Sequence, residues 1–244
     1  MKTAIVLAGH MRSFDKCLPA MMHHVFRHFP GAEFFVTTEP DEDAWKVDLL
    51  KGALPKSRVE VDLTPQPDLQ PVLDGLPIPK DFTLGERFMH EPYFISVPPL
   101  AVLGQLWRLW QVLGMLKFAR YQRVVRLRPD LFFHSYTHRE EVATLVPWWG
   151  RFGGINDRFA ILLPGAAEAY FSTYGNIRGL LEDWCPFHPE SLIVMSMEKQ
   201  HCTAHPYLMA DFSTMRTDGT MRGPEISASD YAGLFAEALT AAIL

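Results

Sequence analysis

Apolar and polar residues alternate in blocks along the first sixty positions of the chain. Short aliphatic or aromatic runs at 3–8, 32–38 and 57–63 predict buried strands, and stretches with helical spacing separate them. A fourth run of this kind occupies 122–128. Strands that alternate with helices favour a parallel sheet covered by helices. We therefore predict an α/β fold with a mostly parallel sheet flanked by helices.

The rest of the chain has a less regular pattern. Residues 64–98 are rich in proline and have no hydrophobic period, which is typical of a long loop or a lid over a binding site. Residues 99–119 are apolar on most sides and predict a buried helix. Further helices are expected at 138–146, 165–181, 188–200 and 227–243, with strands at 151–164 and 205–217. Because no internal repeat is present, we expect one domain over 1–244.

Composition narrows the class of protein. The 244 residues carry a net charge of −5, whereas nucleic-acid binders usually show a basic excess. The three cysteines are widely spaced and form no CxxC pair, which favours a reducing compartment. The first apolar run is too short for a signal peptide, and polar residues interrupt the longest one. We expect a cytoplasmic protein with no transmembrane segment and no nucleic-acid partner.

One predicted strand has an unusual composition. The stretch "YQRVVRLRPDLFF" carries Arg126, Arg128 and Asp130 at alternate positions, so all three share one face of the strand. Pro129 donates no ladder hydrogen bond and marks the strand's end. Ligands of open α/β sheets bind beyond the carboxyl ends of strands. A carboxylate beside arginines suits a divalent cation together with an anionic ligand. A structural ion pair explains the same residues equally well.

A second polar motif follows the first predicted strand. In "LAGHMRSF", Gly9 lies at the turn into a helix, and His10 and Arg12 come next. Backbone amides at such a turn bind phosphates or nucleotides, and Arg12 adds positive potential. Neither the dinucleotide fingerprint nor the P-loop fingerprint is present. The alternative is a turn glycine followed by a surface arginine.

Two further motifs lie downstream. Asn156 and Asp157 interrupt the apolar stretch "GGINDRFAILLP", where a plain hairpin rich in glycine and asparagine is the alternative to a functional loop. His188 and Glu190 flank a proline in "FHPES", at the start of a predicted helix. Helix capping is the simpler interpretation of either residue taken alone.

Taken in order, the four motifs "GHMRSF", "RLRPDLFF", "INDRFAILLP" and "FHPESLI" resemble a known pattern. It is that of small bacterial glycosyltransferase-like proteins associated with capsule or lipopolysaccharide assembly. The resemblance implies a GT-A-like fold and the transfer of a sugar from a nucleotide-diphosphate sugar to a saccharide or other hydroxyl acceptor. It also implies the donor-binding residues, which are Gly9, His10, Arg12, Arg126, Arg128, Asp130 and Asn156.

The resemblance also assigns chemistry. Arg128-Pro129-Asp130 occupies the place of the usual D-x-D, of which only Asp130 remains, and His188 would be a second ligand to Mn²⁺ or Mg²⁺. An inverting enzyme needs a carboxylate base for the acceptor hydroxyl, for which Asp157 is the first candidate and Glu190 the second. A retaining enzyme needs none. The alternatives are a nucleotidyltransferase and a non-catalytic nucleotide-sugar binding protein.

Overall fold

The computed structural model describes residues 1–78, 98–138, 140, 143–149 and 154–222. The central part of the predicted lid, 79–97, and the predicted helix at 227–243 lie outside the described residues.

The four strands predicted first form one half of a seven-stranded sheet with the order β3-β2-β1-β4-β7-β6-β8. All neighbours within this half are parallel. The predicted bounds hold to within two residues, for β1 (Thr3–Ala8), β2 (Glu33–Thr37), β3 (Val59–Asp62) and β4 (Arg123–Leu127). The predicted class, a mostly parallel α/β sheet flanked by helices, is confirmed.

The other half of the sheet contains the antiparallel pairs. β7 (Phe159–Leu162) is antiparallel to both β4 and β6 (Leu145–Pro147), and β8 (His205–Leu208) is parallel to β6. A separate antiparallel sheet has the order β10-β9-β5 and consists of β5 (Leu131–Tyr136), β9 (Ala210–Met215) and β10 (Met221–Arg222). Because β5 begins directly after the turn at Pro129, the chain passes from the large sheet into the small one at that residue.

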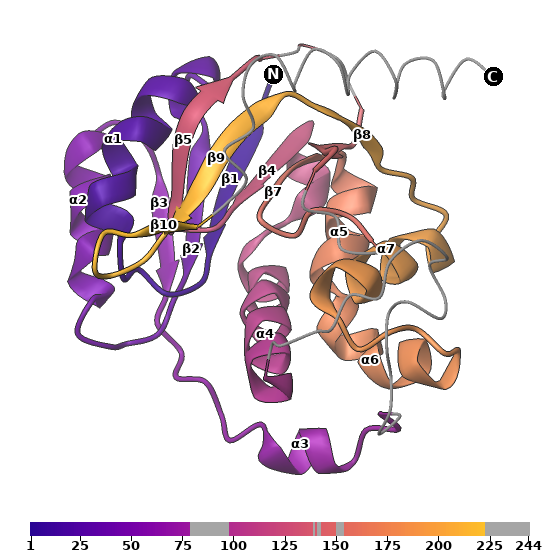
Figure 1. The fold of residues 1–244 in the computed structure, drawn as a ribbon. Helices are drawn as coiled ribbons and strands as arrows, with labels where there is room; N and C mark the ends of the chain where they lie inside the picture. Colours follow the sequence, from indigo (N-terminus) through magenta and orange to yellow (C-terminus); the bar gives the residue numbers. More distant parts are fainter. Residues whose placement is uncertain (79–97, 139, 141–142, 150–153, 223–244) are drawn as a thin grey trace.

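Helices cover both faces of the large sheet (Figure 1). One face carries α4 (Pro99–Met115), α5 (Pro164–Phe171), α6 (Thr173–Glu182) and α7 (Pro189–Lys199). The opposite face carries α1 (Phe14–His24), α2 (Val47–Ala53) and the small sheet. Four short elements complete the described chain: α3 (Gln70–Asp74) and the 3-10 turns η1 (Phe26–His28), η2 (Ala44–Lys46) and η4 (Phe118–Arg120).

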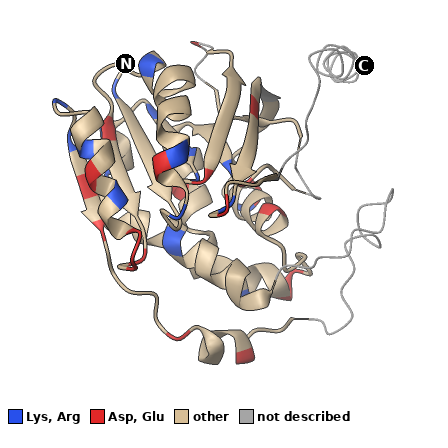
Figure 2. Ribbon diagram, turned by 60° about the vertical axis from the view of Figure 1, so that its left-hand side comes forward, with Lys and Arg blue, Asp and Glu red and all other residues tan. Residues whose placement is uncertain are grey.

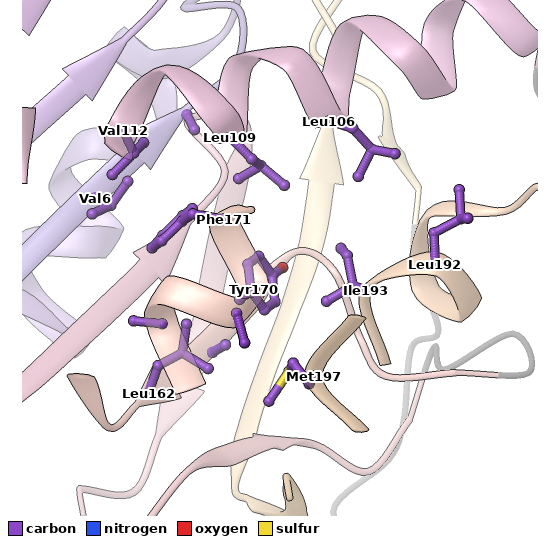
Figure 3. Packing of buried hydrophobic residues seen from close by; sticks show 14 of the residues in the cluster. Val6, Leu106, Leu109, Val112, Leu162, Tyr170, Phe171, Leu192, Ile193 and Met197 are labelled. Atoms are coloured by element: carbon purple, nitrogen blue, oxygen red, sulfur yellow. The ribbon is translucent and has the colours of Figure 1, made fainter. Parts of the chain in front are cut away.

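Strand periodicity divides the interior into two cores. On β1, Ala4 and Val6 belong to the core shared with α4–α7, whereas Ile5 and Leu7 belong to the core shared with α1 and the small sheet. Figure 3 shows Val6 facing Val112 of α4 across the first of these cores. All these side chains are fully buried. A strand buried on both faces is apolar at every position, which explains the continuous run seen in the sequence.

The structure corrects several predicted elements. The end of the helix predicted at 138–146 is instead strand β6, because Leu145 and Val146 are buried between neighbouring strands. The predicted helix 165–181 is two helices that meet at Ser172, whose hydroxyl donates to the carbonyl of Ala169. The strand predicted at 205–217 is divided at Met209 between two sheets. The proline-rich stretch includes the short helix α3.

Candidate functional site

A pocket of about 420 Å³ lies at the carboxyl ends of β1 and β4. The chain passes from β1 to β2 on one side, and β4 pairs with β1 on the other, so the strand order reverses between β1 and β4. In open α/β sheets this reversal is where ligands bind. The volume lies in the range of small-molecule sites. Six residues predicted for donor binding line this pocket, namely Gly9, His10, Arg12, Arg126, Arg128 and Asp130.

A larger hollow of about 810 Å³ lies among the helices on one face of the sheet. Leu113, Lys117 and Lys199 are among the residues that line it. No residue of the four sequence motifs does so. We therefore place the candidate site in the smaller pocket, where the titratable groups gather. Figure 2 shows basic and acidic segments close together at this end of the central sheet, beside α4.

Gly9 sets how closely the first turn approaches β4. Its φ is +136°, in a region that residues with a side chain rarely adopt. A Cβ at this position would lie 3.3 Å from Cδ of Pro129, whose ring cannot swing away. The Gly9 amide donates to the carbonyl of Thr37 at the end of β2. Glycine therefore lets the ends of β1, β2 and β4 meet at the pocket floor.

Arg128 and Asp130 form the ion pair that the sequence left open. Nε of Arg128 donates to Oδ1 of Asp130 at 2.9 Å, and Nη2 donates to Oδ2 at 2.6 Å. Both side chains are partly exposed, at 29% and 18%. The paired geometry fixes the guanidinium plane at the pocket wall. Arg128 and Asp130 therefore form the structural ion pair that was the alternative interpretation, and both residues also line the pocket.

Arg126 lies at the pocket and has no solvent exposure. Its Nη1 donates to the carbonyl of Arg158 at 2.8 Å, while Nε and Nη2 have no hydrogen-bond partner among the residues that the structure describes. Burial lowers the pKa of this guanidinium. Each buried donor without a partner costs about 1–3 kcal/mol, so native proteins rarely contain one unless it has a function. The two free N–H groups beside the pocket are suited to an anionic ligand.

Asp157 lies close to these arginines without lining the pocket. It is only 3% exposed and accepts a hydrogen bond from Gln105, which does line the pocket. Burial alone would raise the pKa of Asp157, but the positive charges of Arg128, Arg158 and Arg126 outweigh it and lower the pKa. A buried carboxylate that holds its charge so firmly is a weak base. The structure thus favours Asp157 as a counter-charge and not as the predicted first-choice base.

Asn156 has a structural role in the same loop. It is fully buried, and its amide nitrogen donates to the carbonyl of Trp149 at 2.9 Å. Its side-chain oxygen accepts from the backbone amides of Arg158 and Phe159. All of these bonds shape the turn into β7, and Asn156 does not line the pocket. The predicted contact with the donor is therefore replaced by a turn-forming role.

His188 and Glu190 pair with each other at the start of α7. Nδ1 of His188 lies 2.7 Å from Oε2 of Glu190, and both side chains are buried. His188 is the N-cap residue but makes no side-chain capping bond. Burial, and then the negative charge of Asp157, raise the pKa of Glu190 to about 7. The capping interpretation is therefore wrong for the His188 side chain, and Glu190 titrates in the range useful for acid–base chemistry.

The predicted metal ligands do not fit a resident cation. Both carboxylate oxygens of Asp130 are used by Arg128, and His188 is paired with Glu190. Within the described ranges, no group of three or more His, Cys, Asp or Glu side chains is arranged to hold a metal ion. A Mn²⁺ or Mg²⁺ site normally offers several oxygen ligands. The prediction of a cation held by Asp130 and His188 thus finds no support in this arrangement and stays a prediction.

The structure adds pocket residues that the sequence did not reveal. Arg108 of α4 is buried and donates to the carbonyls of Thr38 and Thr64, at the ends of β2 and β3. It also pairs with Glu39. Gln105 lies one turn earlier on α4. In the sequence, both are polar interruptions of an apolar helix, and their spacing of three residues places them on one face.

No described helix is both long and apolar enough to cross a bilayer. No protein-family model and no curated protein matches the chain. Among solved structures, two of the glycosyltransferase GlyE from Streptococcus pneumoniae TIGR4 are similar to it. The apo form gives a TM-score of 0.42 at 11% identity and covers 84% of this chain and 44% of that one. The second gives a TM-score of 0.45 at 9% identity, with coverages of 84% and 45%. The chain thus spans less than half the length of these proteins.

Proposed function

We propose that the protein is a glycosyltransferase that moves a sugar from a nucleotide-diphosphate sugar to a saccharide or other hydroxyl acceptor. One observation carries the proposal. Arg126 is buried beside the pocket, and its Nε and Nη2 have no hydrogen-bond partner in the described parts of the chain. Such a cation gains most from an anion with several oxygens, and a diphosphate supplies them.

The neighbouring residues support the same ligand. Arg128 is held by Asp130 at the wall of the pocket, where its charge stays within reach of the diphosphate. Gly9 opens the floor to a close approach of a nucleotide, and it lies where nucleotides bind in open α/β sheets. The four motifs that suggested the glycosyltransferase resemblance supply most of the charged groups in and around this pocket.

The reaction follows from these groups. The acceptor oxygen forms a bond to the anomeric carbon, the bond from that carbon to the diphosphate oxygen breaks, and the nucleoside diphosphate leaves with the electron pair. Negative charge develops on the leaving diphosphate, and the fixed arginines stabilise it. No step in this scheme depends on a metal ion.

For an inverting reaction, we now favour Glu190 over Asp157 as the base. The pKa of Glu190 is about 7, so its carboxylate accepts a proton readily near neutral pH. Asp157 is held ionised by three arginines and has less tendency to accept one. Glu190 is 4% exposed and, like Asp157, does not line the pocket, so the proton of the acceptor hydroxyl would reach its carboxylate through an intervening group.

A panel of ligands tests the proposal. Melting curves are recorded with UDP-, GDP-, CMP- and dTDP-sugars, with nucleoside triphosphates, and with and without Mn²⁺. A rise in Tm with one nucleotide sugar, followed by detection of the free nucleoside diphosphate on adding acceptors, is the expected result. A rise with a nucleoside triphosphate alone would favour a nucleotidyltransferase. Binding without turnover on any acceptor would favour a non-catalytic binding protein, and no shift with any nucleotide sugar would refute the proposal.

A further inference from the structure

Two exposed arginines lie at the mouth of the pocket. Arg12 and Arg216 both line the pocket, and both side chains are exposed to solvent. In the described parts of the chain, neither guanidinium has a hydrogen-bond or ion-pair partner. Asp130, the carboxylate that lines the same pocket, is already paired with Arg128. The mouth therefore carries uncompensated positive charge.

The fold holds these two residues in one place. Ser13 donates its hydroxyl to the carbonyl of Met215 at 2.7 Å, which ties the residue after Arg12 to the residue before Arg216. Nζ of Lys16 donates to the carbonyl of Thr217 at 3.0 Å and adds a third cation nearby. The amide of Met215 donates to the carbonyl of Asp130, so the same joint is fixed to the pocket wall. Segments about 200 residues apart thus meet to build a basic rim, which we define as Arg12, Lys16 and Arg216.

The rim and the floor differ in solvent access. Arg126 at the floor has no exposure, whereas the two rim arginines are open to water. A donor whose diphosphate meets Arg126 fills the closed end of the pocket. The acceptor must then approach from the open side, past the rim.

We infer that the acceptor is an acidic saccharide, one that carries a carboxylate or a phosphate which the basic rim binds. This inference rests on the proposed function and names the substrate class of the same site. Guanidinium groups grip planar carboxylates and phosphates through paired N–H donors, while a neutral sugar would gain little from them. Exposed charges also attract an oppositely charged ligand over several ångströms, and they do so less at high salt.

Binding of a matched pair of probes tests the inference. Trigalacturonate and maltotriose are titrated into the wild-type protein that has been saturated with its nucleoside diphosphate. The same titrations are made with Arg12→Gln, Arg216→Gln and the double variant. Arg120→Gln is the control, because Arg120 is also exposed but precedes β4 at the opposite end of that strand. Nucleoside diphosphate affinity is measured for every variant.

The expected result is a preference of the wild type for the acidic trisaccharide that the double variant reduces about tenfold, as two exposed charge contacts allow. Arg120→Gln keeps the full preference, and 0.5 M salt weakens it. Equal affinities for both trisaccharides, or a preference that the double variant retains, would overturn the inference. A double variant that loses nucleoside diphosphate affinity instead would assign the rim to the donor and also overturn it. If no nucleotide binds the wild type but it still prefers the acidic trisaccharide and the double variant reduces that preference, the proposed function is wrong. The binding of an acidic saccharide by the basic rim is then still correct.

Discussion

The pairing of His188 with Glu190 makes a quantitative prediction about pH and stability. The pKa of Glu190 is about 7 in the folded protein, compared with the ordinary value of 4.5, because burial and the charge of Asp157 disfavour its ionised form. A group whose pKa is raised on folding contributes stability that is fully present below the unfolded pKa. That contribution is lost as the pH rises through the folded pKa. The wild type therefore loses stability at Glu190 between about pH 4.5 and 7.

Glu190→Gln removes this loss, because glutamine resembles the protonated acid and does not titrate. The interval from 4.5 to about 7, at about 1.4 kcal/mol per pH unit, limits the effect to about 3 kcal/mol. Between pH 5 and pH 8, the unfolding free energy of the variant relative to wild type should rise by about 2 kcal/mol. Any constant offset from the lost contact with His188 cancels in this comparison.

Urea denaturation of both proteins at pH 5, 6, 7 and 8 measures this difference. Glu198→Gln is the matched control, since Glu198 lies on the same helix but is exposed to solvent. That variant should differ from wild type by a nearly constant amount across the series. A difference in unfolding free energy between Glu190→Gln and wild type that stays constant with pH would contradict this prediction. It would mean that Glu190 is already ionised at pH 5 and paired with a charged His188.

Three further predictions concern the pocket. Gly9→Ala should lose about 1–3 kcal/mol of unfolding free energy in a urea titration, since the φ of +136° at this position strains any side chain. Gly52→Ala should lose none in the same titration, because the added Cβ meets no neighbouring described group within 4 Å. Arg128→Lys should weaken nucleotide-sugar binding by about 1.5–3 kcal/mol in calorimetry, because lysine cannot keep the two bonds to Asp130 that hold the positive charge at the pocket wall; unchanged affinity would remove Arg128 from the site. Wild type should bind the donor equally well with Mn²⁺ and with EDTA, and a wild-type preference for Mn²⁺ that Asp130→Asn abolishes would restore a metal to the site.

Local pattern was sufficient to predict the parallel half of the sheet. Strands such as β1 are buried on both faces, so every position is apolar and the run is visible in one sequence. Strand β6 was missed because its three residues are a strand only through pairing with β7 and β8, which lie outside its own stretch of sequence. Its composition alone did not distinguish it from a helix end.

Which residues line the pocket was easier to predict from the sequence than what each of them does there. Gly9, Arg126 and Arg128 stand out because charge or glycine at a strand end has few structural uses. Whether Asp157 or Glu190 lies in the stronger positive field depends on tertiary neighbours, which a single sequence does not show. Arg216 was not detectable, because only the bond from Ser13 to Met215 brings its segment to the pocket.

Arg126 provides the most direct test of the account. Arg126→Met removes a buried cation whose Nε and Nη2 have no partner within the described ranges, and the carbonyl of Arg158 that it contacts still accepts from the amide of Arg128 at 3.0 Å. Calorimetric titration with the best nucleotide sugar, together with a melting curve, is the measurement. We expect the variant to lose at least tenfold in affinity for the nucleotide sugar, while its Tm is equal to or above that of wild type. Unchanged affinity, or a lower Tm with normal affinity, would show that Arg126 supports the fold and does not bind the donor.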